Sequence, residues 1–275
     1  MTFEAFAKVN LSLEVLGLRK DGYHEIRSIV QPIAFSDSLD IIPTCDGVVS
    51  SDSVYGDRDL AVRAAQSLRP DVSLGARIGM VKRIPVGSGL GGGSADAAAV
   101  LLALNSLWRL GRTLEELAEV GASVGSDVPA LVFALGRRRP VLMEGRGERV
   151  RFLGEGEIPW IAQIAAKWLV LANPGVCCST AEVYARFSPN HGEGDSCSAA
   201  DGSAMLRNDL LGPACELHPE IGEALSKMRA AGAENVAMSG SGATVFGLAD
   251  DKTSACRIRD EMKKNGYSAW CVRTL

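Results

Sequence analysis

The chain of 275 residues is long enough for one large domain or two of ordinary size, and its 47% apolar and 23% charged residues are typical of a globular protein with a sizeable core. Its net charge of −4 provides no overall attraction to nucleic acid or to an anionic membrane, and no apolar run is long enough to span a bilayer. The amino terminus has neither the basic segment nor the long apolar segment of a signal or transit peptide, so we expect a cytoplasmic protein.

The first 84 residues favour β-structure. Strands are predicted over residues 3–17, 26–43 and 76–84, where branched and aromatic residues partly alternate with polar ones. Within the second of these, Ser36–Ser38 is predicted to form a turn. Asp59 is placed to cap a helix that ends before Pro70.

Three helices are predicted next, after a glycine-rich stretch. The first runs from Ser94 to Leu110 and is apolar on almost every side, so we expect it to be buried. Thr113 and Glu116 have the spacing of a capping box at the start of the second helix, and the third opens at Ser126. A hairpin is predicted over residues 140–153.

The composition changes near residues 154–157, and we predict a domain boundary there. The two domains are then an amino-terminal domain, 1–155, and a carboxy-terminal domain, 156–275. Beyond the boundary we predict a strand over 168–172, a helix capped by Ser179, helices around 205–217, 219–231 and 251–265, and a final strand. The small, polar segment 188–203 is predicted to be a mobile surface loop. Hairpins mixed with helix pairs indicate an α+β fold.

The seven cysteines and three histidines give no pattern typical of a zinc site or a disulfide framework. No two cysteines are spaced C-x-x-C and their number is odd, which favours reduced thiols in a cytosolic protein. Cys177 and Cys178 are adjacent, and adjacent cysteines rarely bridge, so we expect two small buried side chains.

The stretch PVGSGLGGGSADAA, residues 85–98, raises the question of what so many glycines hold. Gly87, Gly89 and Gly92 match a dinucleotide-binding fingerprint, but the helix that follows leads to another helix instead of a strand. A P-loop has similar spacing, but Gly93 stands where its lysine belongs. Two interpretations remain: a different phosphate cradle at the start of a buried helix, or a tight turn without a ligand.

Three stretches together resemble the GHMP kinase superfamily. The glycine-rich stretch resembles its ATP-binding loop, and MSGSGATVFGL resembles its carboxy-terminal glycine motif. The segment AKVNLSLEVLGLRKDGYHEIRSIVQPI, residues 7–33, resembles the amino-terminal motif of one branch, the 4-diphosphocytidyl-2-C-methyl-D-erythritol kinases. VGSDVPALV, NPGVCCSTAEVY and Asn208–Leu210 also resemble this branch, and the matches follow the family's order from residue 7 to residue 248.

This resemblance implies a two-domain α+β GHMP kinase fold with the active site in the interdomain cleft. It implies ATP-dependent phosphorylation of the 2-hydroxyl of 4-diphosphocytidyl-2-C-methyl-D-erythritol, in the non-mevalonate route to isoprenoid precursors. ATP and Mg²⁺ are the expected cofactors, and the expected partner is the small cytidine-diphosphate-linked polyol, with no nucleic acid or membrane.

The resemblance also implies roles for individual residues. Asp127 is expected to accept the proton of the acceptor hydroxyl, while Lys8 keeps Asp127 ionised and neutralises charge on the phosphoryl group. The expected ATP-binding residues are Pro85, Val86, Gly87, Ser88, Gly89, Leu90, Gly91, Gly92, Gly93 and Ser94. Ser94 is also a possible contact to the metal, directly or through water. The expected substrate-binding residues are Asn10, Tyr23, His24, Thr180, Tyr184, Ser239 and Gly240.

Plainer interpretations stand beside these roles. Taken alone, Lys8 is a solvated lysine, Asp127 a helix cap and Tyr184 an amphipathic core residue. The arginines at 137–139, 146, 149 and 151 are more typical of a solvated hairpin than of a nucleic-acid patch. Two rival functions are another kinase of the superfamily, acting on mevalonate or homoserine, and a nucleotide-binding protein without catalysis.

Overall fold

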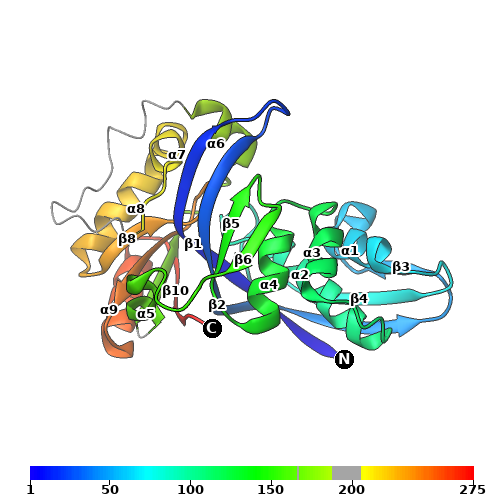
Figure 1. Ribbon diagram of the computed structural model, residues 1–275. Helices are drawn as coiled ribbons and strands as arrows, with labels where there is room; N and C mark the ends of the chain where they lie inside the picture. Colours follow the sequence, from blue (N-terminus) through cyan, green and yellow to red (C-terminus); the bar gives the residue numbers. More distant parts are fainter. Residues whose placement is uncertain (166, 188–205) are drawn as a thin grey trace.

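A computed structural model describes residues 1–165, 167–187 and 206–275 and contains two β-sheets (Figure 1). The six-stranded sheet belongs to the first part of the chain and has the order β3-β4-β2-β5-β6, with β1 paired to β2. Its strands are β1 (Thr2–Leu18), β2 (His24–Thr44), β3 (Val49–Ser51), β4 (Gly75–Val81), β5 (Val141–Gly145) and β6 (Arg149–Phe152).

Strand β2 is continuous, and the predicted turn at Ser36–Ser38 is wrong. These three residues pair with β1, and Asp37 lies opposite Ala5. The Asp37 carboxylate is fully buried, accepts the backbone N–H of Ile84 at 2.8 Å and forms an ion pair with Lys82. Because these partners satisfy the buried charge, a residue type that favours turns is stable within a strand.

Helices α1 (Leu60–Leu68), α2 (Gly92–Leu107), α3 (Leu114–Ala122) and α4 (Val128–Arg137) accompany this sheet (Figure 1). Asp59 caps α1 by accepting the N–H of Ala61, and both hydrogen bonds of the capping box between Thr113 and Glu116 are formed, so both predicted helix starts are confirmed. Helix α2 begins at Gly92 instead of Ser94 and ends at Leu107.

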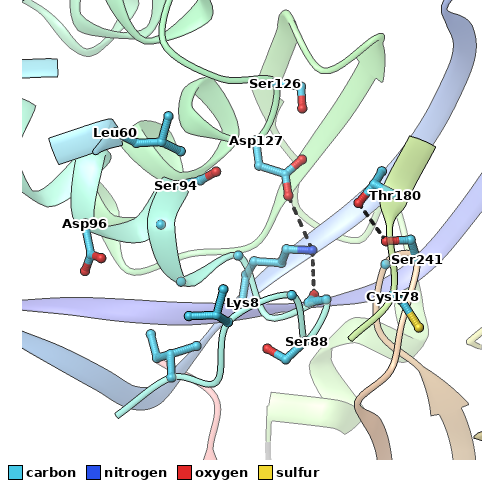
Figure 2. Close-up of a pocket in the computed structure, with 18 of the residues that line it drawn as sticks. Lys8, Leu60, Ser88, Ser94, Asp96, Ser126, Asp127, Cys178, Thr180 and Ser241 are labelled. Carbon is cyan, nitrogen blue, oxygen red and sulfur yellow. Dashed lines mark hydrogen bonds and ion pairs between the residues drawn. The ribbon is translucent and has the colours of Figure 1, made fainter. Parts of the chain in front are cut away.

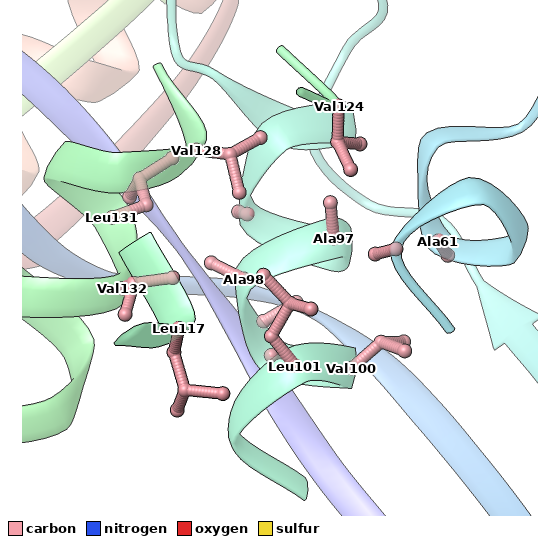
Figure 3. Packing of buried hydrophobic residues seen from close by; sticks show 14 of the residues in the cluster. Ala61, Ala97, Ala98, Val100, Leu101, Leu117, Val124, Val128, Leu131 and Val132 are labelled. Carbon is pink, nitrogen blue, oxygen red and sulfur yellow. The ribbon is translucent and has the colours of Figure 1, made fainter. Parts of the chain in front are cut away.

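Helix α2 is buried, as predicted. Its alanines and leucines pack against residues of α1, α3 and α4, which Figure 3 shows around Ala97, Ala98 and Leu101. Small side chains on all faces let the neighbouring elements approach the helix closely. The amino terminus of α2, which carries the glycine-rich stretch, is therefore held in a fixed position.

The second sheet has four strands in the order β10-β7-β9-β8. They are β7 (Trp168–Asn173), β8 (Glu234–Met238), β9 (Val245–Ala249) and β10 (Ser268–Arg273). The helices of this part are α5 (Pro159–Ala165), α6 (Thr180–Arg186), α7 (Leu211–Leu217), α8 (Pro219–Ala230) and α9 (Lys252–Lys264). Helix α7 begins later than predicted, and the predicted loop 188–203 lies outside the described residues.

The two sheets share one hydrophobic cluster. Val9 and Ile33 of the first sheet belong to the same cluster as Leu171 and Phe246 of the second. A backbone hydrogen bond from Leu13 to the carbonyl of Arg207 adds a direct link between β1 and the later part of the chain.

The domain boundary between residues 155 and 156 stays a prediction. Within the described ranges, no helix has the length and hydropathy needed to cross a membrane.

Candidate active site

A cavity of about 1030 Å³ is lined by β1, the glycine-rich stretch, the start of α4, helix α6 and the loop between β8 and β9. Figure 2 shows part of its lining. Most of the predicted site residues line this cavity, although they come from distant parts of the sequence: Lys8, Asn10, Tyr23, His24, Pro85, Val86, Gly87, Ser88, Gly89, Gly91, Gly92, Gly93, Ser94, Asp127, Thr180, Tyr184 and Gly240.

Lys8 and Asp127 meet in this cavity (Figure 2). The Lys8 Nζ lies 3.5 Å from the Asp127 Oδ2, and the two side chains are 4% and 34% exposed. Lys8 Nζ also donates to the Asn10 Oδ1 and, at 2.9 Å, to the carbonyl of Gly89. Asp127 occupies the N-cap position of α4, but its side chain makes no capping hydrogen bond. Its carboxylate therefore faces the cavity, available to a ligand.

The glycine-rich stretch takes backbone conformations that favour glycine. Gly87, Gly89 and Gly91 all have positive φ, and Gly91 is the N-cap of α2. The first N–H groups of a helix have no partner within it, so those at the start of α2 are available to an anion in the cavity. A Cβ on Gly89 would lie 2.1 Å from the carbonyl oxygen of Ser239, so this glycine permits a close approach of two backbones.

Two predicted contacts do not reach the cavity. Leu90 is fully buried in the core, and its carbonyl accepts the backbone N–H of Lys8 at 3.1 Å. Ser239 is also fully buried; its hydroxyl donates to the carbonyl of Gly89 at 2.9 Å and accepts the N–H of Asn10 at 3.2 Å. Both residues hold β1 against the glycine-rich stretch, and their assignment as ligand contacts stays a prediction.

Aromatic rings gather at one end of the cavity. The rings of His24 and Tyr184 are stacked, with centroids 5.2 Å apart and planes 29° apart. The Tyr23 ring is exposed, and the guanidinium of Arg146 lies 5.2 Å from its centroid. Burial raises the pKa of the Tyr184 phenol, and the charge of Asp127 adds to the rise, so the ring stays neutral. This end presents flat aromatic surfaces suited to a base.

A charge cluster with two buried carboxylates also borders the cavity, and the sequence analysis missed it. Lys82 lies between the carboxylates of Asp37 and Asp96, and both Lys82 and Asp96 line the cavity. Burial raises the pKa of Asp96 to about 7, against the opposing effect of Lys82. Burial lowers the pKa of Lys82, but the two carboxylates outweigh it and the net shift is upward. A charged residue within a helix otherwise apolar on every face was the available signal, because a buried charge requires a partner.

The two adjacent cysteines have different environments. Cys178 is buried and lines the cavity, and burial raises its pKa to about 11. Cys177 is exposed, which corrects the expectation that both are buried. A Cβ on Gly87 would lie 2.4 Å from the Sγ of Cys177, so this thiol packs against the glycine-rich stretch.

The arginine-rich hairpin forms ion pairs of its own. Arg149 pairs with Glu25, and Arg151 pairs with Glu157 at 2.6 Å. Arg138 and Arg139 lie over the rings of Phe6 and Phe152. These contacts agree with the interpretation of a solvated hairpin.

Comparisons with known proteins agree with this geometry. The family model for the GHMP kinases N terminal domain matches residues 59–135, and that for the GHMP kinases C terminal matches residues 202–268. A 4-diphosphocytidyl-2-C-methyl-D-erythritol kinase of Geobacter sp. (strain M21) is 41% identical to this chain, over 98% of this chain and 97% of its own length.

Solved structures have the same fold. A crystal structure of 4-(cytidine 5'-diphospho)-2C-methyl-D-erythritol kinase matches with a TM-score of 0.80 and 36% identity, covering 99% of this chain and 98% of its own. The mevalonate kinase of Methanococcus jannaschii, 15% identical with a TM-score of 0.68 over 100% of this chain and 98% of its own, shares the fold alone. The expected GHMP kinase fold is thereby confirmed. Its sequence relatives and its fold together place the chain in the 4-diphosphocytidyl-2-C-methyl-D-erythritol kinase family of the GHMP kinases.

Proposed function

We propose that this chain transfers the γ-phosphoryl group of ATP to the 2-hydroxyl of 4-diphosphocytidyl-2-C-methyl-D-erythritol, the substrate named in its relatives. The observation that carries the proposal is the presence, in one cavity, of the Lys8–Asp127 pair, the start of α2 and the stacked rings of His24 and Tyr184. The start of α2 suits the phosphates of ATP, the Lys8–Asp127 pair suits the acceptor hydroxyl, and the stacked rings suit the cytosine base.

The triphosphate of ATP is placed over the glycine-rich stretch. Backbone N–H groups at the start of α2 and the positive end of the helix dipole stabilise the β- and γ-phosphates, so no Walker lysine is needed. Lys8 reaches this stretch directly, because its Nζ donates to the carbonyl of Gly89. The same ammonium is therefore close to both the phosphates and Asp127.

The acceptor hydroxyl is placed against Asp127. As its oxygen forms a bond to the γ-phosphorus, the bond from that phosphorus to the bridging oxygen breaks, ADP leaves and the proton passes to the Asp127 carboxylate. Phosphoryl transfer has a loose transition state, so orientation of the hydroxyl and stabilisation of charge by Lys8 matter more than base strength. Asn10 helps to hold the Lys8 ammonium in place by accepting a hydrogen bond from it.

Magnesium is the expected partner of the triphosphate, and the residues present fit it. Mg²⁺ is usually held by one or two protein oxygens together with phosphates and waters, and Ser94, which lines the cavity at the start of α2, would supply its hydroxyl oxygen. Among the described residues, no three His, Cys, Asp or Glu side chains form a metal cluster. When bound, the ion neutralises charge on the β- and γ-phosphates.

The acceptor can be tested directly with Mg-ATP and a measurement of ADP release. We expect turnover with 4-diphosphocytidyl-2-C-methyl-D-erythritol and none with mevalonate or homoserine, whose molecules carry no base to place against His24 and Tyr184. Cytidine diphosphate should compete with the substrate. Turnover with mevalonate or homoserine would mean that this chain is a GHMP kinase with a different acceptor. ATP binding without turnover on any acceptor would favour the rival function, a nucleotide-binding protein without catalysis.

Alkylation by iodoacetamide tests where ATP lies. At pH 8 we expect Cys177 and Cys45, both exposed, to react, whereas Cys178 stays unlabelled. A thiol with a pKa of about 11 is only about one part in a thousand thiolate at pH 8. ATP should slow the labelling of Cys177, which packs on Gly87, and leave Cys45 unchanged. Mass spectrometry of the labelled peptides measures all three sites, and equal protection of Cys45 and Cys177 would argue against this placement.

A further inference from the structure

The substrate of the proposed function carries a diphosphate between its base and its polyol, and this group needs a positive partner. Four cations line the cavity in the described part of the chain: Lys8, Arg58, Lys82 and Arg146. Lys8 is buried at the reacting centre, and Lys82 is neutralised by two carboxylates. Arg58 lies just before α1, two residues from Leu60, whose side chain would lie 3.5 Å from a Cβ on Gly93, so this part of the chain borders the glycine-rich stretch. Arg146 is the cation that remains.

Arg146 belongs to a segment that contacts both the aromatic end and the residue before Asp127. It belongs to the turn that joins β5 and β6, and its guanidinium lies 5.2 Å from the centroid of the Tyr23 ring. The next residue, Gly147, packs so closely that a Cβ there would lie 2.3 Å from the carbonyl oxygen of Ser126. Ser126 directly precedes Asp127. The turn therefore connects the two places where the base and the acceptor hydroxyl are proposed to bind.

Neighbouring charges fix the backbone of this turn. Glu148 accepts the N–H of Arg146 at 2.6 Å and, through its other oxygen, an N–H of Arg19 at 3.4 Å. Arg19 in turn pairs at 2.7 Å with Glu25, the residue after His24. The turn is thus tied to the β1–β2 hairpin that carries Tyr23 and His24. Within the described residues, the guanidinium of Arg146 forms no ion pair; its charge acts at longer range on Asp21, whose pKa is lowered most by the backbone N–H of Tyr23 and further by this guanidinium, and it stays exposed beside the cavity.

We propose that Arg146 is a specificity-determining residue that binds the diphosphate of the acceptor substrate while its guanidinium rests on the Tyr23 ring. A planar guanidinium can hold two phosphate oxygens at once and can stack on an aromatic ring at the same time. This inference rests on the proposed function, because it assumes that a cytidine diphosphate group occupies the aromatic end.

Calorimetric titration with cytidine and with cytidine diphosphate tests this role without any turnover. We expect Arg146→Ala to weaken binding of cytidine diphosphate about 10-fold, the loss expected for one charge-assisted contact at an exposed site, and to change cytidine binding less than twofold. Arg146→Lys should recover part of the loss, since it restores charge without the planar fork. Arg151→Ala is the matched control: the same hairpin loses an exposed arginine that pairs with Glu157 and does not line the cavity.

The outcomes separate the inference from the proposed function. If the wild type binds cytidine diphosphate and Arg146→Ala weakens cytidine and cytidine diphosphate equally, Arg146 only supports Tyr23 and the inference is overturned. Unchanged binding of both ligands in that variant overturns it as well. If the wild type binds neither ligand, the proposed function itself fails, and the inference fails with it.

Discussion

Replacing Asp127 with asparagine is expected to lower kcat about 10³-fold, the typical contribution of a positioned general base. Asparagine keeps the shape of the side chain but cannot accept the hydroxyl proton. The fold should persist, because Asp127 makes no capping hydrogen bond and Lys8 keeps its contacts with Asn10 and Gly89. Steady-state kinetics of ADP release measure the effect, and calorimetry should give dissociation constants for ATP and cytidine diphosphate within a few-fold of the wild type.

The same measurements can contradict this role. A loss of kcat below about 10-fold would mean that alignment of the hydroxyl and stabilisation by Lys8 carry the reaction without a base, which a loose transition state permits. A loss of ATP affinity equal to the loss of kcat would instead assign Asp127 to nucleotide binding. Asp127→Glu separates charge from position, since it keeps the carboxylate and moves it by one methylene.

The second large effect is expected for Gly89→Ala. Gly89 has a positive φ of 76°, and a Cβ there would lie 2.1 Å from the carbonyl oxygen of Ser239 and 2.8 Å from that of Gly242. Backbone atoms cannot rotate away as a side chain can, so we expect the free energy of unfolding to fall by about 4 kcal/mol. ATP binding should be lost as well, because the glycine-rich stretch must shift to make room. Denaturant titration and calorimetry measure the two effects.

Gly111→Ala is the matched control for this prediction. Gly111 also has a positive φ, 66°, but no atom lies within 4 Å of a Cβ placed there. It therefore isolates the conformational cost of alanine, about 1 kcal/mol, from the steric clash. If both variants lose the same stability, close packing against Ser239 is not what requires glycine at position 89.

Local signals account for the elements that the sequence analysis predicted well. Asp59 and Thr113 could be predicted to start helices because a capping side chain interacts only with the next few residues. The buried helix α2 follows from its own composition. The Ser36–Ser38 segment was misjudged for the opposite reason: the partners that keep Asp37 inside a strand, Lys82 and the backbone of Ile84, come from a distant part of the chain.

The residues of the candidate site divide in the same way: some can be predicted from their residue type and motif, and others depend on contacts with distant parts of the chain. Family resemblance identified Lys8 and Asp127, whose residue types already suggest charge chemistry, and the structure brings them together. Ser239 was expected to bind a ligand, and its hydroxyl also joins two backbone groups, those of Asn10 and Gly89, which no local sequence pattern reveals. Arg146 looked like one more solvated arginine, because its position depends on the Tyr23 ring and on packing at Ser126.

The hydroxyl of Ser239 joins parts of the chain that are made at very different times. It joins the N–H of Asn10, 229 residues earlier in the chain, to the carbonyl of Gly89, which in turn holds the Lys8 ammonium. Contacts between such distant segments form only after a large loop has closed. During synthesis on the ribosome, the hydrogen bonds of Ser239 to Asn10 and Gly89 therefore cannot form until residue 239 has been made, and an unfinished chain lacks the link that joins β1 to the glycine-rich stretch from this side.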